Sequence, residues 1–284
     1  MNGWSPPIYP FTFAAARGAR AVVARVARVD QPLPPSTLPR RTVLIETALV
    51  LGVSLGASAL WSVLAIVRRL TEGVALSQQT ARMNTSVTPD RPWLDLAYQL
   101  AGIALALVPV ALAVHLLTRD RVRPAMIGLD RLAPWRDLAA GAGLAALVGV
   151  PGLAFYLAAR AVGLNATVSA AGLADVWWAV PVLILAAVQN AVLEEVVMVG
   201  YLFTRWRQAG CSPLVVVVAS AVIRGTYHLY QGFGGFLGNV AMGLLFGWVF
   251  RRTSRVMPLV VAHALVDVVA FVGYATLHGR VGWL

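Results

Sequence analysis

The chain has 284 residues, of which 59% are hydrophobic and only 12% are charged. A soluble domain carries about twice that charged fraction, so the composition excludes an ordinary soluble protein. Apolar runs reach the length of about 20 residues that a membrane-spanning helix needs, and they lack the period-two alternation of strands. The sequence therefore predicts an all-α, polytopic transmembrane helical bundle, because lipid offers unpaired backbone groups no partner.

The formal net charge is +11, and every basic residue is Arg, which is typical of a GC-rich bacterial genome. The sequence pI of about 11.1 also fits a nucleic-acid partner. Arginines beside membrane spans have a simpler cause in the positive-inside rule, so we expect no nucleic acid. Cys211 is the single cysteine, which excludes a disulfide within the chain.

Residues 1–41 form a basic N-terminal arm without the compact apolar core of a cleavable signal peptide. Within it, residues 14–29 place arginines and valines on opposite sides at helical spacing, which predicts an amphipathic helix in the headgroup plane. The alternative for this segment is a disordered basic tail. A Pro-rich linker then leads into a transmembrane domain at 42–284.

We predict seven spans in the transmembrane domain. They cover residues 42–67, 93–117, 137–159, 176–206, 213–229, 236–250 and 256–277. With a cytoplasmic N-terminus, sixteen arginines fall in cytoplasmic segments and six in outer segments, which favours this orientation. We therefore expect a multi-pass protein of the cell membrane with its N-terminus in the cytoplasm.

Ionisable residues within three of these apolar segments form the most informative pattern. Of twelve acidic residues, only Glu194, Glu195 and Asp267 lie deep in hydrophobic stretches. The fifth and seventh segments add pairs at helical i, i+4 spacing, and each pair shares one helix face. These pairs are Arg224 with His228, and His263 with Asp267.

Each charge inside a membrane costs roughly 2.5–3.5 kcal/mol on insertion scales, so six such groups must satisfy one another and mark a site. The alternative is a polar cluster that only specifies helix packing. Glu194 and His228 lie at similar depths along their helices. His263 lies only about 8 residues after Arg255, roughly 12 Å along a helix, so the last segment must be tilted or re-entrant.

The Gly-rich stretch 232–238 predicts a tight bend between two spans, because no strand precedes it as in a phosphate loop. Gln231 and Asn239 flank this stretch, and either side-chain amide can serve as a hydrogen-bond donor at the site. For Asn239 the competing interpretation is a helix N-cap after Gly238.

Three motifs in order resemble the CPBP family of CAAX proteases and bacteriocin-processing enzymes, which are intramembrane glutamic endopeptidases. The family pattern is Glu-Glu-x-x-x-Arg, then Phe-x-x-x-His, then His-x-x-x-Asn or Asp. The matching positions are Glu194-Glu195, Arg224 to His228, and His263 to Asp267. The resemblance covers about residue 176 to the C-terminus, with a core at about 176–277.

The resemblance implies hydrolysis of a peptide bond in a hydrophobic peptide or membrane-protein substrate, with no metal or cofactor. By position, Glu194 is the general base that activates water, and His228 helps to hold that water. His263 assists, and Asp267 takes the family's Asn/Asp place near the oxyanion. Glu195 lies about 100° from Glu194 around a helix, so it supports the site from behind.

Two positions depart from the family pattern. Val199 replaces the motif arginine, and Arg224 replaces the motif phenylalanine. We hypothesise that these are one change, in which the guanidinium moved to the next helix and still pairs with Glu195. The alternative is a catalytically degenerate binding or immunity protein on the same scaffold.

A zinc hydrolase is the remaining alternative. Glu194, His228 and His263 provide three ligands with a fourth position open, although they lie on three helices and form no His-Glu-x-x-His motif.

Overall fold

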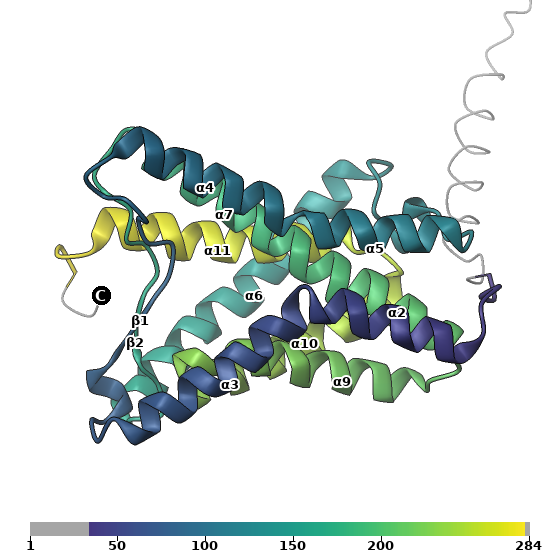
Figure 1. Cartoon of the computed structure of the whole chain (residues 1–284), viewed down its shortest axis with the longest axis horizontal. Coiled ribbons are helices and arrows are strands. Elements are labelled where there is room, and N and C mark those ends of the chain that lie inside the picture. The colour runs from purple at the N-terminus through teal and green to yellow at the C-terminus, as the bar shows by residue number, and fades with distance from the viewer. Residues whose placement is uncertain (1–33, 282–284) are drawn as a thin grey trace, which may run out of the picture.

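The computed structural model describes residues 34–281, and these residues are mostly helical (Figure 1). The predicted all-α class is confirmed. The predicted amphipathic helix at 14–29 lies outside the described residues.

The helices are α2 (Arg40–Gly52), α3 (Leu55–Thr71), α4 (Pro92–Ala106), α5 (Val108–Arg119), α6 (Pro134–Ala161), α7 (Ala179–Glu194), α8 (Leu202–Gln208), α9 (Pro213–Tyr227), α10 (Phe233–Thr253) and α11 (Met257–Leu277). A π-helical segment, Glu195–Tyr201, joins α7 to α8 in one continuous helix. Two short strands, β1 (Thr80–Arg82) and β2 (Thr167–Ser169), complete the fold.

Proline and glycine set several of these boundaries. Pro92, Pro134 and Pro213 occupy the first turn of their helices, where a missing N–H costs nothing. Pro109 cannot donate to the carbonyl four residues earlier, so the continuous apolar stretch is divided into α4 and α5. Gly210, with φ of +80°, ends α8 and allows the chain to turn into α9.

Each predicted span corresponds to a helix or a helix pair, but the count of seven is not confirmed. In the described part of the chain, five helices are long and apolar enough to cross a membrane. Helices α2 and α3 make a sixth only if the pair, bent by 54°, is taken as one span. Helix α9 has 15 residues, short of the roughly 20 that a full crossing needs.

The bend predicted for the Gly-rich stretch is confined to Gly232, whose φ is +121°. Helix α10 begins at the next residue, so Asn239 lies inside that helix and is not an N-cap. Instead, its side-chain amide donates to the Gly235 carbonyl at 3.0 Å.

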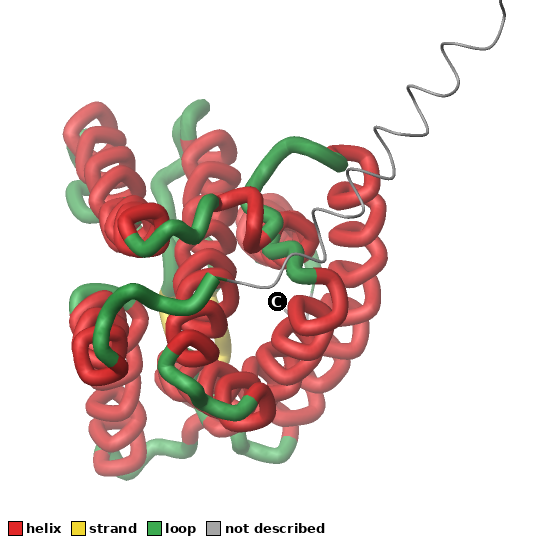
Figure 2. The backbone as a smooth tube through the Cα atoms, turned by 90° about the vertical axis from the view of Figure 1, so that its right-hand side faces the viewer, coloured by secondary structure: helices red, strands yellow, loops and turns green. Residues whose placement is uncertain are grey.

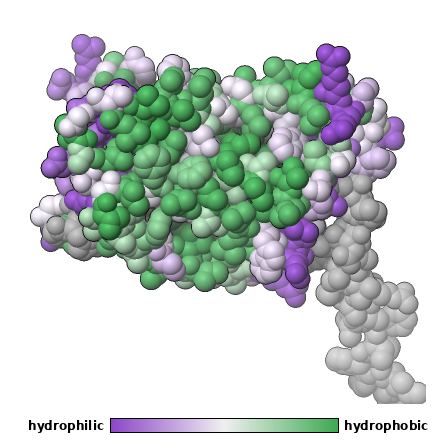
Figure 3. Space-filling model, turned by 90° about the horizontal axis from the view of Figure 1, so that it is seen from below, coloured by the Kyte–Doolittle hydropathy of each residue, from purple (hydrophilic) through white to green (hydrophobic). Residues whose placement is uncertain are grey.

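The long helices run side by side along the longest axis of the molecule (Figures 1 and 2). Helix α11 packs against both α6 and α7, and α10 packs against α9. The face in Figure 3 carries a broad apolar band between hydrophilic ends, as expected for a protein surrounded by lipid. The parallel pair β1–β2 crosses one end of the bundle (Figure 1).

The start of α11 is recessed into the bundle, and this resolves the mismatch in depth. Val256 N donates to the Ile127 carbonyl at 2.9 Å. A methyl group at Gly200 would lie 3.0 Å from Ile127 and 3.8 Å from Val256. Helix α11 therefore begins about level with Gly200, only five residues after Glu195. His263 reaches the depth of the glutamates because its helix starts deeper, and no re-entrant helix is required.

A buried ionic cluster at the other end of the bundle joins four segments. The Arg205 side chain is fully buried, with 2.6 Å contacts to Asp120 Oδ2 and to Glu46 Oε2. Ser36 Oγ and the backbone N–H of Thr37 donate to Asp120 at 2.5 and 2.9 Å. Burial raises the pKa of Asp120, but these hydrogen bonds and the one from Arg205 outweigh burial and lower it to about 2. The linker before α2 is thereby held against the start of the loop after α5.

We predict that Asp120→Asn lowers the free energy of unfolding by roughly 2–3 kcal/mol, because the substitution removes a charged partner of buried Arg205. The lowered pKa makes this stabilisation complete above the unfolded pKa of about 4. It is lost as the pH falls towards 2. Thermal unfolding in micelles should show the difference from wild type shrinking over that range. Exposed Asp90→Asn is the control, and a pH-independent difference would contradict the prediction.

Candidate active site

The two adjacent glutamates lie where the long helix from α7 to α8 widens. Glu194 ends α7 and Glu195 opens the π-helical segment, in which a β-branched, valine-rich sequence precedes Gly200. Valine is a weaker α-helix former than leucine or alanine, and π-helical turns are frequent at functional sites. Glu195 is fully buried, and Glu194 is 8% exposed.

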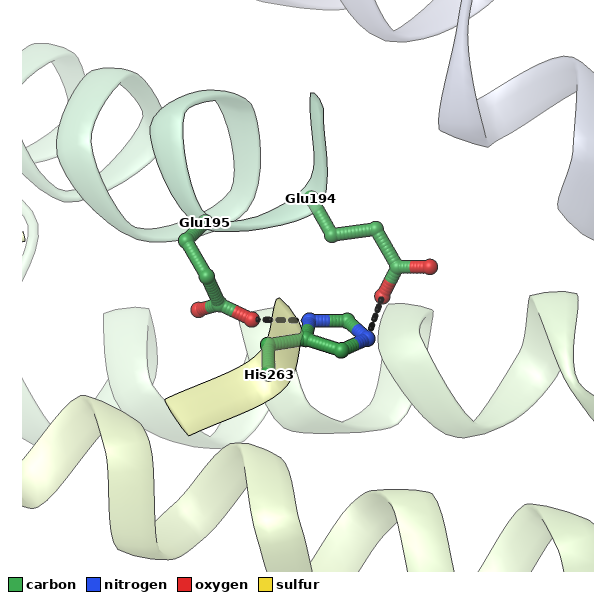
Figure 4. Close-up of side chains that lie close together, drawn as sticks. All are labelled: Glu194, Glu195 and His263. Atoms are coloured by element: carbon green, nitrogen blue, oxygen red, sulfur yellow. Dashed lines mark hydrogen bonds and ion pairs between the residues drawn. The ribbon is translucent and has the colours of Figure 1, made fainter. Parts of the chain in front are cut away.

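The glutamates flank the two edges of one imidazole (Figure 4). Glu195 Oε1 lies 2.7 Å from His263 Nδ1, and Glu194 Oε2 lies 4.0 Å from His263 Nε2. Because an ionised carboxylate only accepts hydrogen bonds, Nδ1 carries a proton and donates to Glu195. This bond fixes the ring so that Nε2 faces Glu194. Glu195 therefore orients the His263 ring.

Arg224 of α9 reaches both carboxylates. Its Nη2 donates to Glu195 Oε1 at 2.7 Å, and its Nη1 lies 3.5 Å from Glu194 Oε2. The side chain is 1% exposed, and its guanidinium lies 5.7 Å from the centre of the Phe246 ring. The predicted pairing of Arg224 with Glu195 is confirmed.

The end of α9 supplies two further contacts to Glu194. Tyr227 Oη donates to Glu194 Oε2 at 2.7 Å. His228 Nε2 lies 3.8 Å from Glu194 Oε1 and, although buried, has no hydrogen-bond partner among the described residues. Sequence reasoning missed Tyr227. The available signal was a tyrosine next to His228 at the end of a largely apolar helix.

Asp267 lies one helical turn beyond His263. Its Oδ2 is 3.7 Å from His263 Nε2, and its carboxyl also interacts with Asn190 of α7. Asp267 and Asn239 both line a cavity next to the cluster. The structure thus brings together all six ionisable residues singled out in the sequence.

The spacing around Glu194 suits one bound water. The gaps of 3.8 Å to His228 and 4.0 Å to His263 are too long for direct hydrogen bonds. One water in such a gap lies within hydrogen-bond reach of both partners. Each of these two gaps, one at Oε1 and one at Oε2 of Glu194, therefore has the length that a bridging water spans.

Three buried side chains of the cluster have the spacing of a metal site, although Glu195 takes the place of His228 in the zinc alternative. Ligand atoms of Glu194, Glu195 and His263 lie within 4.8 Å of one another, a spacing that suits a cation. However, the Arg224 guanidinium already lies against both carboxylates. Its fixed positive charge would repel a dication at short range in a low-dielectric site. The donor set therefore does not fit zinc well.

Comparison with known proteins supports the resemblance seen in the motifs. Residues 176–269 match the family described as type II CAAX prenyl endopeptidase Rce1-like. This segment is therefore similar to the CPBP family of CAAX proteases. No curated protein and no solved structure matches the chain.

The CPBP segment holds all six clustered residues, and apolar helices accompany it on its N-terminal side. The chain is thus a multi-pass membrane protein, and its C-terminal part is similar to CAAX-type intramembrane proteases.

We predict that Arg224→Phe abolishes peptide cleavage. Adding Val199→Arg to this variant should restore a substantial part of the cleavage. Residue 199 lies on the glutamate-bearing helix and is buried, so a guanidinium there has Glu195 within one turn. Thermal unfolding and peptide cleavage should be measured for wild type, both single variants and the double variant. A double variant as inactive as Arg224→Phe, although folded, would show that the two positions are independent.

Proposed function

We propose that the protein hydrolyses a peptide bond within the membrane, with Glu194 as the general base for a bound water. The observation that carries this proposal is the position of the Glu194 carboxylate, 3.8 and 4.0 Å from two imidazole Nε2 atoms. The Arg224 guanidinium and the Tyr227 hydroxyl keep this carboxylate ionised, and an ionised carboxylate within reach of a water can accept its proton.

In the proposed reaction, Glu194 accepts a proton from water while the water oxygen bonds to the substrate carbonyl carbon. The carbon–nitrogen bond then breaks, and the same proton passes from Glu194 to the leaving amine. His228 holds the water, and His263, protonated on both ring nitrogens, donates from Nε2 to the tetrahedral intermediate. Asp267 donates to the oxyanion only when protonated, since an ionised carboxylate would repel it.

Arg224 and Tyr227 act by positioning Glu194. The Tyr227 hydroxyl and the guanidinium both approach Glu194 Oε2, at 2.7 and 3.5 Å. Glu194 Oε1 is thereby left to face His228 and the water. Val199 stands where the family motif has an arginine, and Arg224 supplies a guanidinium to the same glutamate. This replacement argues against a degenerate, purely binding role.

The substrate is a hydrophobic or membrane-associated peptide, which matches the apolar lining of the cavity next to the site. The surrounding bilayer is the cell membrane, and the excess of arginines at the α5–α6 and α10–α11 connections supports a cytoplasmic N-terminus.

We predict that Glu194→Gln and Glu194→Ala each lower kcat by about 10²–10⁴-fold, the usual contribution of a general base. The assay uses protein in nanodiscs and two quenched peptides, one with a farnesylated CAAX end and one without the lipid. Glu72→Gln, at an exposed position, is the control. Cleavage that survives Glu194→Ala would refute the assignment of the base.

Native substrates should be retained by Glu194→Gln in native membranes and identified by mass spectrometry, with Glu194→Ala as the comparison.

A metal-independent mechanism predicts that chelators leave cleavage unchanged and that purified protein holds no stoichiometric zinc. Inhibition by a chelator with recovery on adding zinc would favour the zinc hydrolase instead. Elemental analysis of the purified protein provides the independent measurement.

A further inference from the structure

Strand β2 has one edge paired with β1 and one edge turned away from it. Thr167 N donates to the Gln79 carbonyl, and Met83 N donates to the Ser169 carbonyl, both at 2.9 Å. In a parallel ladder with this register, Thr167 and Ser169 direct both backbone groups to β1. The N–H and C=O of Val168 therefore point to the opposite side.

The outward edge of β2 faces the cavity next to the active site. This cavity has a volume of about 800 Å³ and lies between α6, α10 and α11. Val168 and Ala170 of this edge line it together with His263 and Asp267 of the cluster. Val168 N–H donates at 2.9 Å to the hydroxyl of Tyr156, which is also a cavity residue.

The beginning of β2 is attached to the active-site cluster. Ala166 N donates to the Gln231 carbonyl at 2.8 Å. Gln231 Nε2 in turn lies 3.4 Å from His228 Nδ1. The strand edge, the cavity and the glutamate cluster therefore form one continuous site.

The cavity also opens on the apolar surface of the protein. Val150 of α6 and Val269 of α11 both line it, yet they are 73% and 72% exposed. A hydrophobic segment in the lipid therefore has a lateral path into the cavity.

We propose that the outward edge of β2 binds the substrate backbone as an added strand, with an extended apolar peptide as the occupant that displaces the Tyr156 hydroxyl from Val168 N–H. A peptide bond must leave helical form before attack, because a helix shields its backbone. The released N–H and C=O groups are costly in an apolar cavity unless they are paired. The edge at Val168 supplies such partners, and alternate side chains of the peptide then enter the apolar cavity. This inference rests on the proposed function.

The decisive comparison is Val168→Pro against Tyr156→Phe. Both variants lose the hydrogen bond between Tyr156 and residue 168, so the loss of this one intramolecular bond is the same in both. Only Val168→Pro removes the edge donor, while the bonds from β2 to β1 are kept, since proline is tolerated at an outward strand position. Tyr156→Phe frees the same N–H for the peptide. Val168→Ala controls for the side chain.

Binding is measured with the farnesylated CAAX peptide carrying a fluorophore, on Glu194→Gln protein so that catalysis plays no part. We expect Val168→Pro to weaken binding roughly 3- to 10-fold, the value of one lost hydrogen bond. Tyr156→Phe should bind equally or more tightly. Equal weakening in both variants, with matched thermal unfolding, would overturn the proposal.

Peptide cleavage by the same variants, with Glu194 intact, distinguishes a failure of the strand-edge inference from a failure of the proposed protease function. If wild type cleaves the peptide and the two variants have the same KM, the strand inference is wrong and the proposed function stands. If binding shifts in opposite directions but wild type does not cleave, the strand inference stands and the proposed function fails.

Discussion

The guanidinium of Arg224 makes it possible for two neighbouring carboxylates to stay buried in one apolar helix. Placed together without a cation, Glu194 and Glu195 would repel each other in a medium of low dielectric. Arg224 contacts both of them, and His263 Nδ1 donates to the same Glu195 oxygen that accepts from Arg224. The rest of the site is arranged around this pairing, because Arg224 enters from α9 and His263 enters from α11. The three helices must therefore converge at one depth.

That convergence also explains features of the fold that are far from the reaction. Helix α11 begins beside Gly200, which brings His263 level with the glutamates. Arg255, just before α11, lies 3.1 Å from Asp130 and 2.6 Å from Asp137, so the recessed start is tied to the beginning of α6. The position of His263 is thus maintained by ion pairs at the end of its own helix.

The sequence predicted the helices and the six clustered residues because both follow from strong local signals. Long apolar runs in a membrane protein form helices, because lipid cannot pair with free backbone groups. Ionisable groups inside such runs must contact one another, because each is costly to bury alone in lipid. Other features had no such signal. The π-helical turn at Glu195 has the same apolar composition as an α-helix, and β2 is a three-residue strand whose partner lies far away in the sequence. The depth of His263 depended on a loop contact with Ile127, which no pattern in the last helix indicates.

The division between α9 and α10 shows the same limit. A bend at the Gly-rich stretch was predicted, but only Gly232 needs a positive φ. The remaining glycines are helical. At Gly234 the helices α10 and α6 pack so closely that a methyl group on this residue would lie only 2.6 Å from the Ala159 side chain. Close packing between helices and a turn in the chain both favour glycine, so composition alone does not separate them.

The central claim is that Glu194 and the two imidazoles hold one water between them. A cryo-EM structure of the wild-type protein in lipid nanodiscs, at a resolution that shows ordered solvent, tests this most directly. We expect a single density peak within hydrogen-bond distance of Glu194, His228 Nε2 and His263 Nε2. A Glu194 side chain turned away from both rings, or bonded to them directly with no room for solvent, would contradict the account.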